Sequence, residues 1–285
     1  MSATAATTAR SAFRVPERPD LAAIDPRGRP VGPSDKDEAA EAIAELGDRL
    51  DQLQEALFAE ATGGGRRSLL LVLQGMDTSG KGGVIRHVAG LVNPQGLQIA
   101  AFKRPTQEEL RHDFLWRIRK QLPGPGRIGV FDRSHYEDVL VVRVNGLVRE
   151  SVWRERYRTI NEFETELSAH GTTVVKCMLH ISPQEQAERL LARLDDPSKH
   201  WKYNSGDLDA RAKWSEYQQA YADALRECDS DTAPWYVIPA DRKWYRNWAV
   251  ASVLAETLAE LDPTYPRSHL DVDAERARIA ASVVP

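Results

Sequence analysis

The chain of 285 residues is long enough to bury a large core, and its length favours one big domain or two small ones. Its 38 basic and 42 acidic residues give a formal charge of -4, which argues against a general nucleic-acid-binding protein but leaves room for a local basic groove. No apolar run reaches the length of a membrane span, and Cys177 and Cys228 lack metal or redox spacing. We therefore expect a cytoplasmic protein with reduced thiols that binds neither membranes nor nucleic acids.

The first 35 residues are expected to form a disordered or extended N-terminal arm. Residues 1–18 are rich in Ala, Thr, Ser and Arg, a composition that organelle transit peptides share. A disordered tail on a cytosolic protein is the simpler interpretation, and we adopt it. Ser34 and Asp37 then resemble a capping box, which predicts a helix with apolar residues three and four apart that ends at the glycines 63–65.

Beyond this helix, apolar strands alternate with helices. Strands are expected at residues 69–73, 97–102, 128–131, 173–181 and 235–238. Helices are expected from Thr106, which pairs with Glu109 as a capping box, to about Leu122, after Ser182, and from Trp244 to Leu261. Such alternation predicts a five-stranded parallel sheet with helices on both faces, a three-layer α/β fold. The charged segment 134–165 is too long for a simple crossover and is expected to form a helical lid on a main domain of residues 36–262, followed by a C-terminal tail, 263–285.

Residues 75–83, Gly-Met-Asp-Thr-Ser-Gly-Lys-Gly-Gly, join the first strand to a helix. Gly75, Gly80 and Lys81 fit the G-x-x-x-x-G-K frame of a P-loop, in which backbone N–H groups and a lysine hold phosphate oxygens. Gly82 replaces the Ser or Thr that normally binds Mg²⁺, and Asp77 adds a carboxylate. A turn kept for packing alone would explain the glycines but not the lysine and the carboxylate. The loop residues expected to contact substrate are Gly75, Thr78, Ser79, Gly80, Gly82 and Gly83.

The third strand ends at Asp132, and Arg133 follows it. The carboxyl ends of parallel strands meet at one edge of the sheet, where ligands of such folds bind and where the loop 75–83 also falls. An aspartate after an apolar strand is a weak signal alone, because Asp commonly begins turns, but with a P-loop it is typical of a second Mg²⁺ anchor. We therefore predict that Asp77 and Asp132 hold Mg²⁺, with Mn²⁺ as an alternative ion, and that Arg133 faces the same phosphates.

Further basic residues occur after strands or in lid-like loops. They are Lys103 and Arg104 after the second strand, Arg189 and Arg193 four apart on one helix face, and Lys199 and Lys202 in a turn-rich stretch. Each one alone fits a solvated surface charge, but their shared placement favours a groove for a polyanion.

Histidines and tryptophans are given structural interpretations. His135, His180 and His200 need not carry phosphate, because a P-loop enzyme transfers the phosphoryl group in line without a covalent carrier. Four tryptophans are interpreted as packing residues rather than base-stacking platforms, namely Trp116, Trp201, Trp214 and Trp244.

Five segments together resemble the polyphosphate kinase 2 family: residues 75–83, 102–106, 113–117, 131–138 and 201–202. The similarity covers roughly residues 40–262. It implies a P-loop kinase-like fold and Mg²⁺-dependent transfer of phosphoryl groups between inorganic polyphosphate and nucleotides, with AMP, ADP, ATP and guanine nucleotides as candidates. We also expect a homo-oligomer, either a dimer or a tetramer.

The resemblance also implies roles for single residues. Asp77 matches the catalytic loop aspartate of the family, and Lys81 matches its P-loop lysine. Asp132 and Arg133 match its second acidic–basic pair, and Arg189, with Arg193 as the alternative, matches an arginine that contacts phosphate. Residues 134–165 look like the lid of the family.

The acceptor nucleotide stays open between AMP and ADP. Residues His135–Asp138 are similar to members that phosphorylate both AMP and ADP, but those members often carry Asp at the position of Gly82 and Asn at that of Asp132. Both departures look like ADP-directed members. Glu137 is a candidate for completing a second Mg²⁺ site when the acceptor is AMP, whose single phosphate brings fewer metal ligands.

Two other functions compete with this interpretation. An ATP-dependent P-loop kinase of a nucleotide or small molecule shares the loop, although Gly82 in place of Ser or Thr counts against it. A non-catalytic module that binds polyanions or nucleotides would be expected to have lost Asp77 or Lys81, and both are present.

Overall fold

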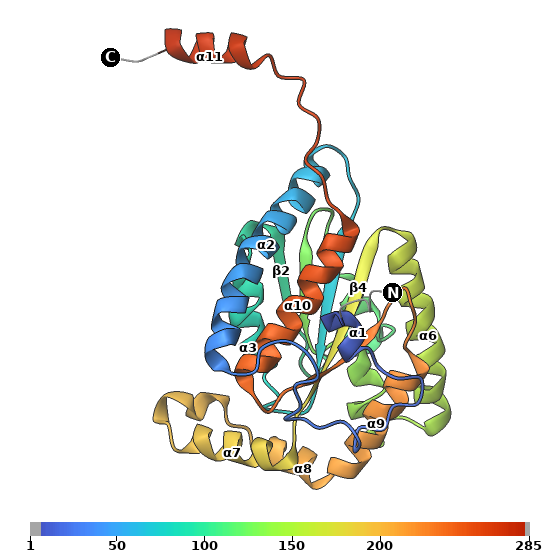
Figure 1. The fold of residues 1–285 in the computed structure, drawn as a ribbon. Helices are drawn as coiled ribbons and strands as arrows, with labels where there is room; N and C mark the ends of the chain where they lie inside the picture. The colour runs from blue at the N-terminus through green and yellow to red at the C-terminus, as the bar shows by residue number, and fades with distance from the viewer. Residues whose placement is uncertain (1–6, 283–285) are drawn as a thin grey trace, which may run out of the picture.

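The computed structural model describes residues 7–282 and shows a parallel sheet between two layers of helices (Figure 1). Its strands are β1 (Ser68–Gln74), β2 (Leu97–Ala101), β3 (Ile128–Asp132), β4 (Thr172–His180) and β5 (Trp235–Pro239), in the order β2-β3-β1-β4-β5. Every neighbouring pair is parallel. The predicted fold class and all five predicted strands are therefore confirmed.

The helices differ widely in length. The longer ones are α2 (Lys36–Thr62), α6 (Glu150–Ala169), α7 (Pro183–Leu194), α9 (Trp214–Glu227) and α10 (Lys243–Leu261). The shorter ones are α1 (Ala9–Phe13), α3 (Lys81–His87), α4 (Trp116–Arg119), α5 (Val141–Val144), α8 (Gly206–Ala212) and α11 (Val272–Ala281). The 3₁₀ helices are η1 (Ala89–Leu91), η2 (Pro94–Gly96), η3 (Glu109–Arg111), η4 (His135–Asp138) and η5 (Pro197–Lys202).

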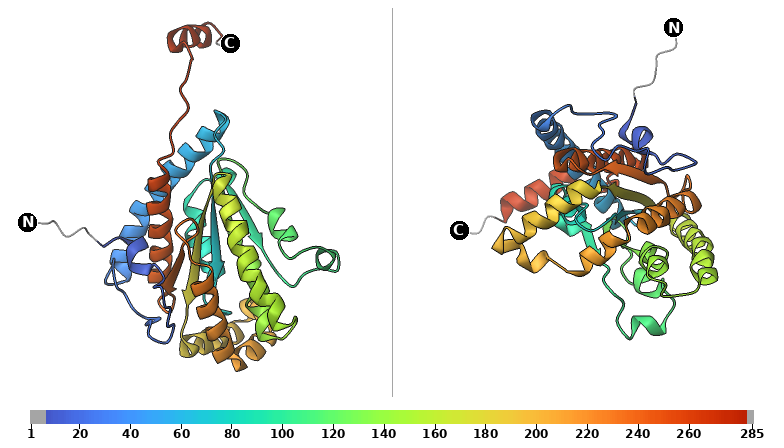
Figure 2. Two further views of the ribbon diagram at one scale, coloured as in Figure 1. Left: turned by 90° about the vertical axis from the view of Figure 1, so that its right-hand side faces the viewer. Right: turned by 90° about the horizontal axis from the view of Figure 1, so that it is seen from below.

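The core lies around β1, whose seven residues are all buried. Helices α2 and α10 cover one face of the sheet and α6 covers the other (Figure 2), so the central strands can be apolar throughout. In the register of the sheet, Leu73 pairs with Asp132 and Gln74 pairs with Met178. The loop that begins at Gly75 and the end of β3 therefore meet at the same edge.

The N-terminal arm is ordered from residue 7 onward, so the prediction of disorder is wrong for residues 7–18. Phe13 packs edge-on against Tyr245 and Trp248, with ring centroids 6.1 and 6.3 Å apart. The backbone N–H of Val15 donates to the carbonyl of Trp235 at 3.0 Å. The arm is ordered because its apolar side chains Phe13 and Val15 are buried against the rest of the protein. The overall composition of residues 1–18 did not reveal this packing. Residues 1–6 lie outside the described part.

Two of the predicted helix starts need correction. Asp35, not Ser34, is the N-cap of α2, because its carboxylate accepts the N–H groups of Asp37 and Glu38. The capping box of Thr106 and Glu109 exists, with contacts of 2.8 and 3.2 Å, but it opens only the single turn η3.

No continuous helix reaches Leu122. His112 is extended, with φ -111° and ψ 170°, and interrupts the helical backbone. The side chain of Asp113 then accepts the N–H of Leu115 at 3.0 Å and starts a new turn that leads into the short α4.

Part of the expected lid belongs to the body of the protein. Residues 150–165 lie in α6, whose Ile160 and Phe163 are buried and which packs against β4. The charged outer face of this helix produced the lid-like pattern. The segment from α7 to α8 instead lies across the carboxyl ends of the strands (Figure 1), so it is the better candidate for a cover over that edge.

Candidate functional site

The loop after β1 bends around the side chain of Lys81. Gly75 and Gly80 have φ values of 146° and 109°, and Thr78 has a φ of 63°, which is unusual for a residue with a side chain. The Nζ atom of Lys81 donates to the carbonyl of Gly75 at 2.7 Å, and burial followed by the charge of Arg133 lowers its pKa. Helix α3 begins at Lys81 without a side-chain cap, so its first N–H groups can bind an anion.

Arg189 clamps this loop from α7. Its Nε atom donates to Glu185 at 2.8 Å, and its Nη1 atom donates to the carbonyls of Thr78 and Ser79 at 2.9 and 3.1 Å. Its Nη2 atom donates to the carbonyls of residues 240 and 241 at 2.7 and 2.8 Å. A guanidinium has five N–H donors, so these contacts use all of them. In this geometry Arg189 ties the P-loop to the loop after β5 and keeps no donor for a phosphate.

A second arginine, Arg246 of α10, lies directly under the loop and was not foreseen from the sequence. Its Nη1 atom donates to the carbonyl of Ser79 at 3.3 Å. A Cβ atom at Gly80 would lie 1.8 Å from Nη1, and one at Gly83 would lie 2.6 Å from Nη2. The packing of Arg246 therefore requires glycine at both positions, whereas a Cβ atom at Gly82 would meet nothing within 4 Å.

The environment of Arg246 is unusual for a charged group. It is only 3% exposed, and burial together with the nearby Arg189 lowers its pKa to about 10. Within residues 7–282 no carboxylate forms an ion pair with it. The local sequence does not single it out, because Arg242, Lys243 and Asn247 lie close to it in the chain.

Two of the predicted site carboxylates contact Arg133. Its Nη2 atom donates to Asp77 Oδ1 at 2.6 Å, and its Nη1 atom donates to Glu137 Oε2 at 3.2 Å. Burial alone would lower the pKa of Arg133, but the carboxylates of Glu137 and Asp77 raise it. Burial and the charge of Arg133 lower the pKa of Lys81, and the carboxylates of Asp77, Asp132 and Glu137 raise it, so these five predicted residues share one site.

A small cavity of about 30 Å³ opens onto Asp77, Arg133 and Glu137. Its walls also include residues of α5, α8 and α9, with Tyr217 and Tyr221 of α9 among them. The loop is also held from α7, where the fully buried amide of Gln186 donates to the carbonyl of Asp77 at 3.0 Å. These tyrosines and Gln186 were not predicted, because nothing in the local sequence pattern singles them out.

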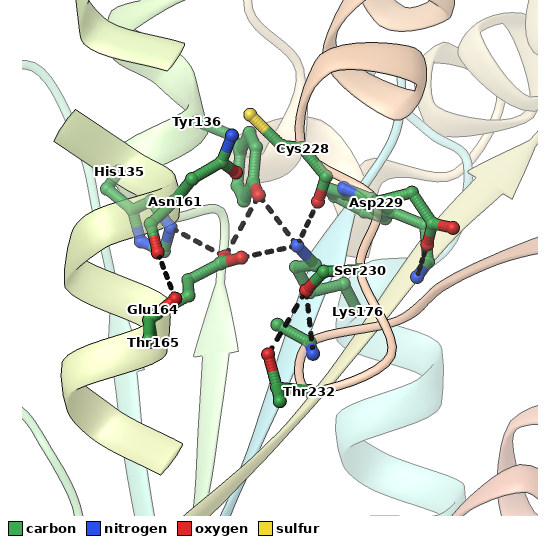
Figure 3. Close-up of polar contacts among 12 residues, drawn as sticks. His135, Tyr136, Asn161, Glu164, Thr165, Lys176, Cys228, Asp229, Ser230 and Thr232 are labelled. Carbon is green, nitrogen blue, oxygen red and sulfur yellow. Dashed lines mark hydrogen bonds and ion pairs between the residues drawn. The ribbon is translucent and has the colours of Figure 1, made fainter. Parts of the chain in front are cut away.

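A buried polar network lies behind the site and holds the segment that follows Arg133 (Figure 3). Lys176 of β4 pairs with Glu164 of α6 and also donates to the hydroxyl of Tyr136 at 2.9 Å and the carbonyl of Cys228 at 2.6 Å. Glu164 accepts the hydroxyl of Tyr136 at 2.9 Å and contacts His135 Nε2 at 3.2 Å. The network therefore fixes the turn η4, which carries Glu137.

Charge within this network is balanced by pairing. Burial favours the neutral form of Glu164, but Lys176 and His135 together hold its pKa below the usual value. Burial is the main cause that lowers the pKa of His135. A neutral, buried His135 that contacts Glu164 has a structural role, in line with the interpretation of the sequence.

The remaining predicted basic residues lie away from the P-loop contacts. Lys103 and Arg104 are exposed after β2. Arg193 pairs with Asp207 at 3.2 Å, and Lys199 pairs with Asp196 at 2.6 Å. Lys202 is exposed, with Nζ 5.0 Å from the ring of Trp201.

The packing role predicted for Trp201 is wrong, because this side chain is 79% exposed. Its position in η5, within the segment across the carboxyl ends of the strands, leaves its ring open to a ligand or to solvent. Trp116, by contrast, stacks on His112 with ring centroids 3.9 Å apart.

The residues present fit a magnesium ion that is shared with a substrate. Mg²⁺ in phosphoryl-transfer sites takes one or two carboxylates and completes its shell with phosphate oxygens and water. Asp77 and Asp132 are both partly exposed at the edge of the sheet, and the buried hydroxyls of Thr78 and Ser79 have no hydrogen-bond partner. Within residues 7–282 no group of three or more His, Cys, Asp or Glu side chains could hold a metal by itself.

Membrane insertion receives no support from the helices. In the part of the chain that the structure describes, none of them is both long enough and apolar enough to cross a bilayer.

Known proteins match this chain along most of its length. The family model of polyphosphate kinase 2 matches residues 33–266. The AMP/ADP-polyphosphate phosphotransferase of Meiothermus ruber is 50% identical over 248 residues, which cover 87% of this chain and 91% of that protein. The ADP-polyphosphate phosphotransferase of Rhodopseudomonas palustris is 45% identical over 233 residues, covering 78% and 79%. The crystal structure of Polyphosphate Kinase 2 from Arthrobacter aurescens TC1 is similar with a TM-score of 0.94 and 49% identity, covering 97% of this chain and 98% of that one.

Proposed function

Because the chain belongs to the polyphosphate kinase 2 family, we propose that it transfers phosphoryl groups between inorganic polyphosphate and both AMP and ADP. The observation that carries this proposal is the cluster of Asp77, Arg133 and Glu137 beside the buried Lys81 of a P-loop. A carboxylate inside the loop suits a reaction in which the protein must hold both a metal-bound donor and a phosphate acceptor.

The residues divide into those that meet phosphate and those that hold the loop. Lys81 and the first N–H groups of α3 bind the transferred phosphoryl group, and Arg133 stabilises the charge that develops on it. Asp77 and Asp132 would hold Mg²⁺ or Mn²⁺, which would supply positive charge to neutralise the phosphate oxygens. Arg189 acts as a positioning residue, because its five donors are used by Glu185 and backbone carbonyls.

Acceptance of both AMP and ADP requires a site that binds the acceptor at two depths. The open space around Gly82 leaves room in front of the loop, which a bulkier side chain would fill. Arg133 contacts both Glu137 and Asp77, so the two carboxylates lie close to each other. Glu137 is therefore placed to add a metal ligand when the acceptor brings only one phosphate.

The polyphosphate chain is proposed to extend from the P-loop toward exposed cations at the carboxyl edge of the sheet. Lys103 and Arg104 after β2 and Lys202 in η5 are exposed there. They would attract a polyanion even though the whole chain has a charge of -4. We place the enzyme in the cytoplasm, a reducing compartment compatible with the two free, buried cysteines of the described chain.

The proposal is tested by incubating the purified protein with Mg²⁺ and polyphosphate together with AMP, ADP, GMP or GDP, each alone, and identifying the products. We expect ADP and then ATP from AMP, and ATP from ADP, with the guanine reactions reporting base selectivity. A parallel reaction with ATP as sole donor separates the alternatives. Activity with ATP but not with polyphosphate would indicate an ATP-dependent kinase, and binding without any turnover would indicate a non-catalytic module.

A further inference from the structure

Arg246 brings a buried positive charge to the P-loop from beneath. It lies in the first turn of α10, a helix that packs against α3 directly after the loop (Figure 1). The residue is almost completely buried, so water does not solvate its guanidinium. A charge in such a place is costly unless an opposite charge compensates it.

The described chain does not supply that opposite charge. The other two arginines at the loop have carboxylate partners, since Arg133 pairs with two of them and Arg189 pairs with Glu185. Within residues 7–282 the contacts of the Arg246 guanidinium are an amide oxygen and a backbone carbonyl. Burial and then the like charge of Arg189 lower the pKa of Arg246 to about 10. The charge is therefore uncompensated beneath a loop whose sequence is that of a phosphate-binding loop.

Hydrogen bonding does not account for a charged group at this position. The Nε and Nη2 atoms of Arg246 donate to the side-chain oxygen of the adjacent Asn247 at 3.2 and 2.8 Å, and Nη1 donates to the carbonyl of Ser79 at 3.3 Å. Arg189 donates to the same carbonyl at 3.1 Å, so the loop is held there without Arg246. An apolar side chain of similar volume would fill the space without the cost of burying a charge.

The guanidinium packs against one face of the loop backbone, and another face is open. A Cβ atom at Gly80 would lie 1.8 Å from Nη1 and one at Gly83 would lie 2.6 Å from Nη2, so the guanidinium lies directly on the backbone of both residues. A Cβ atom at Gly82 would meet nothing within 4 Å. A single layer of backbone therefore separates the guanidinium from an anion bound on the open face. A buried charge acts across such a layer with little screening.

We propose that Arg246 raises the affinity of the P-loop for a phosphate chain from beneath the loop, and that the bound phosphates compensate its charge. This inference rests on the proposed function for the presence of phosphate at the loop. The phosphate chain of polyphosphate and that of a nucleoside triphosphate share the chemistry that would meet this charge. Arg246 does not touch the reacting atoms in this arrangement, so it acts through the loop rather than as a catalytic residue.

The first experiment measures the binding of inorganic tripolyphosphate with Mg²⁺ by isothermal titration calorimetry. Arg246→Gln removes the charge but keeps a hydrogen-bond donor, and it should weaken binding at least about tenfold, or about 1.4 kcal/mol. The matched control Arg242→Gln removes a charge from the start of the same helix, where the half-buried side chain donates to the carbonyl of Arg27. The control should change binding less than about twofold. Equal affinities of the two variants would overturn the proposal.

Arg246→Lys separates the charge from the shape of the side chain, because lysine keeps the charge but lacks the planar fork of arginine. Binding is compared at about pH 6, since burial lowers the pKa of a lysine. Arg246→Lys should bind tripolyphosphate within about threefold of the unmodified chain under these conditions. Binding as weak as that of Arg246→Gln would show that packing, not charge, is what the position requires, and would overturn the proposal.

Urea unfolding with and without tripolyphosphate gives an independent measure. A ligand that binds the folded state raises the free energy of unfolding, and this rise should be smaller for Arg246→Gln than for Arg242→Gln, whatever the stability of the free proteins. An equal rise would contradict the proposal. Should Arg246→Gln fail to fold, Arg246→Met serves as the neutral variant in both experiments.

Parallel measurements separate this inference from the proposed function. ATP with Mg²⁺ is titrated into the same variants, and the turnover of the unmodified chain with polyphosphate is followed. Weakened ATP binding in Arg246→Gln, without polyphosphate turnover by the unmodified chain, would contradict the proposed function and keep the role of Arg246. Polyphosphate turnover together with unchanged binding in Arg246→Gln would overturn that role alone. Binding of neither phosphate chain by the unmodified protein would overturn both.

Discussion

Arg133 Nη2 donates to the Asp77 carboxylate across 2.6 Å and so links the residue that follows β3 to the middle of the P-loop. The same guanidinium holds Glu137 with its other terminal nitrogen at 3.2 Å. One arginine thus keeps two carboxylates at the site proposed to bind a phosphate and its metal. Because the side chain of Arg133 is 36% exposed, this pairing can be exchanged for contacts with a substrate.

Arg133 and Arg189 are expected to respond differently to replacement by lysine. Arg189→Lys leaves several buried carbonyls of the loop without a donor and should lower the free energy of unfolding by about 2–4 kcal/mol, together with turnover. Arg133→Lys should lower turnover at least as much but change unfolding by less than about 1 kcal/mol. Urea unfolding and initial rates measured on both variants decide the matter. Unchanged stability with lost activity in Arg189→Lys would instead make it a direct phosphate contact.

Glu137 is expected to matter more for AMP than for ADP. Glu137→Ala removes a carboxylate that can complete a metal shell when the acceptor carries a single phosphate. It also frees Arg133, which should reduce both reactions to a similar degree. The informative quantity is therefore the ratio of kcat/KM for AMP to that for ADP, which should fall by about tenfold relative to the unmodified protein, a difference of about 1.4 kcal/mol. A constant ratio would reject the role of Glu137 in acceptor choice.

The buried pair of Lys176 and Glu164 should be strongly coupled. Lys176→Met leaves the carboxylate of Glu164 buried without its main counter-charge and should cost about 3–5 kcal/mol of unfolding free energy. Adding Glu164→Gln should recover much of that loss, because the amide no longer requires a cation. A double-mutant cycle by chemical denaturation measures the coupling. Additive losses would show that the two groups act independently.

Asp138 should make the stability depend on pH. Burial, partly opposed by Arg156, raises the pKa of Asp138 from 3.8 to about 6. The folded protein therefore binds this proton more tightly than the unfolded chain, so the contribution is fully present below pH 4 and is lost as the pH rises to 6. Between pH 4 and 6 this titration should lower the free energy of unfolding by an amount on the order of 2–3 kcal/mol. Asp138→Asn should remove this decrease, as measured by unfolding at several pH values.

Asp196→Asn is the matched control for this titration. The ion pair and hydrogen bonds from Lys199 and Ser198 lower the pKa of the exposed Asp196 to about 2. Its contribution is present above its unfolded pKa and is lost only as the pH falls below about 4. The pH profile of this variant should therefore run parallel to that of the unmodified protein between pH 4.5 and 7. A parallel profile for Asp138→Asn as well would contradict the prediction for Asp138.

Local patterns in the sequence predicted the sheet well and the helices less well. The apolar runs of β1 and β4 reflect burial on both faces, and this signal is strong in the sequence. The packing of Phe13 depends on contacts with residues far along the chain, namely Tyr245 and Trp248. Such contacts leave little trace in a local pattern of residues.

The sequence also predicted part of the candidate site. Asp77, Lys81, Asp132 and Arg133 lie in motifs whose spacing reflects phosphate chemistry, and the structure brings them together. Arg246 could not be located in this way, because its role depends on the approach of α10 to the P-loop. The sequence also could not show that the donors of Arg189 are used by backbone carbonyls, since that depends on the exact path of two loops.

The most direct test of the whole account is the formation of ATP from ADP and polyphosphate in the presence of Mg²⁺, followed for the unmodified chain and for Asp77→Asn. The unmodified chain should form ATP at a rate that falls as salt screens the basic edge. Asp77→Asn should keep its melting temperature but lose at least about a hundredfold in rate, because it removes the loop carboxylate that is proposed to hold the metal. ATP formation by Asp77→Asn at most of the original rate, or no ATP formation from polyphosphate by the unmodified chain, would contradict the account.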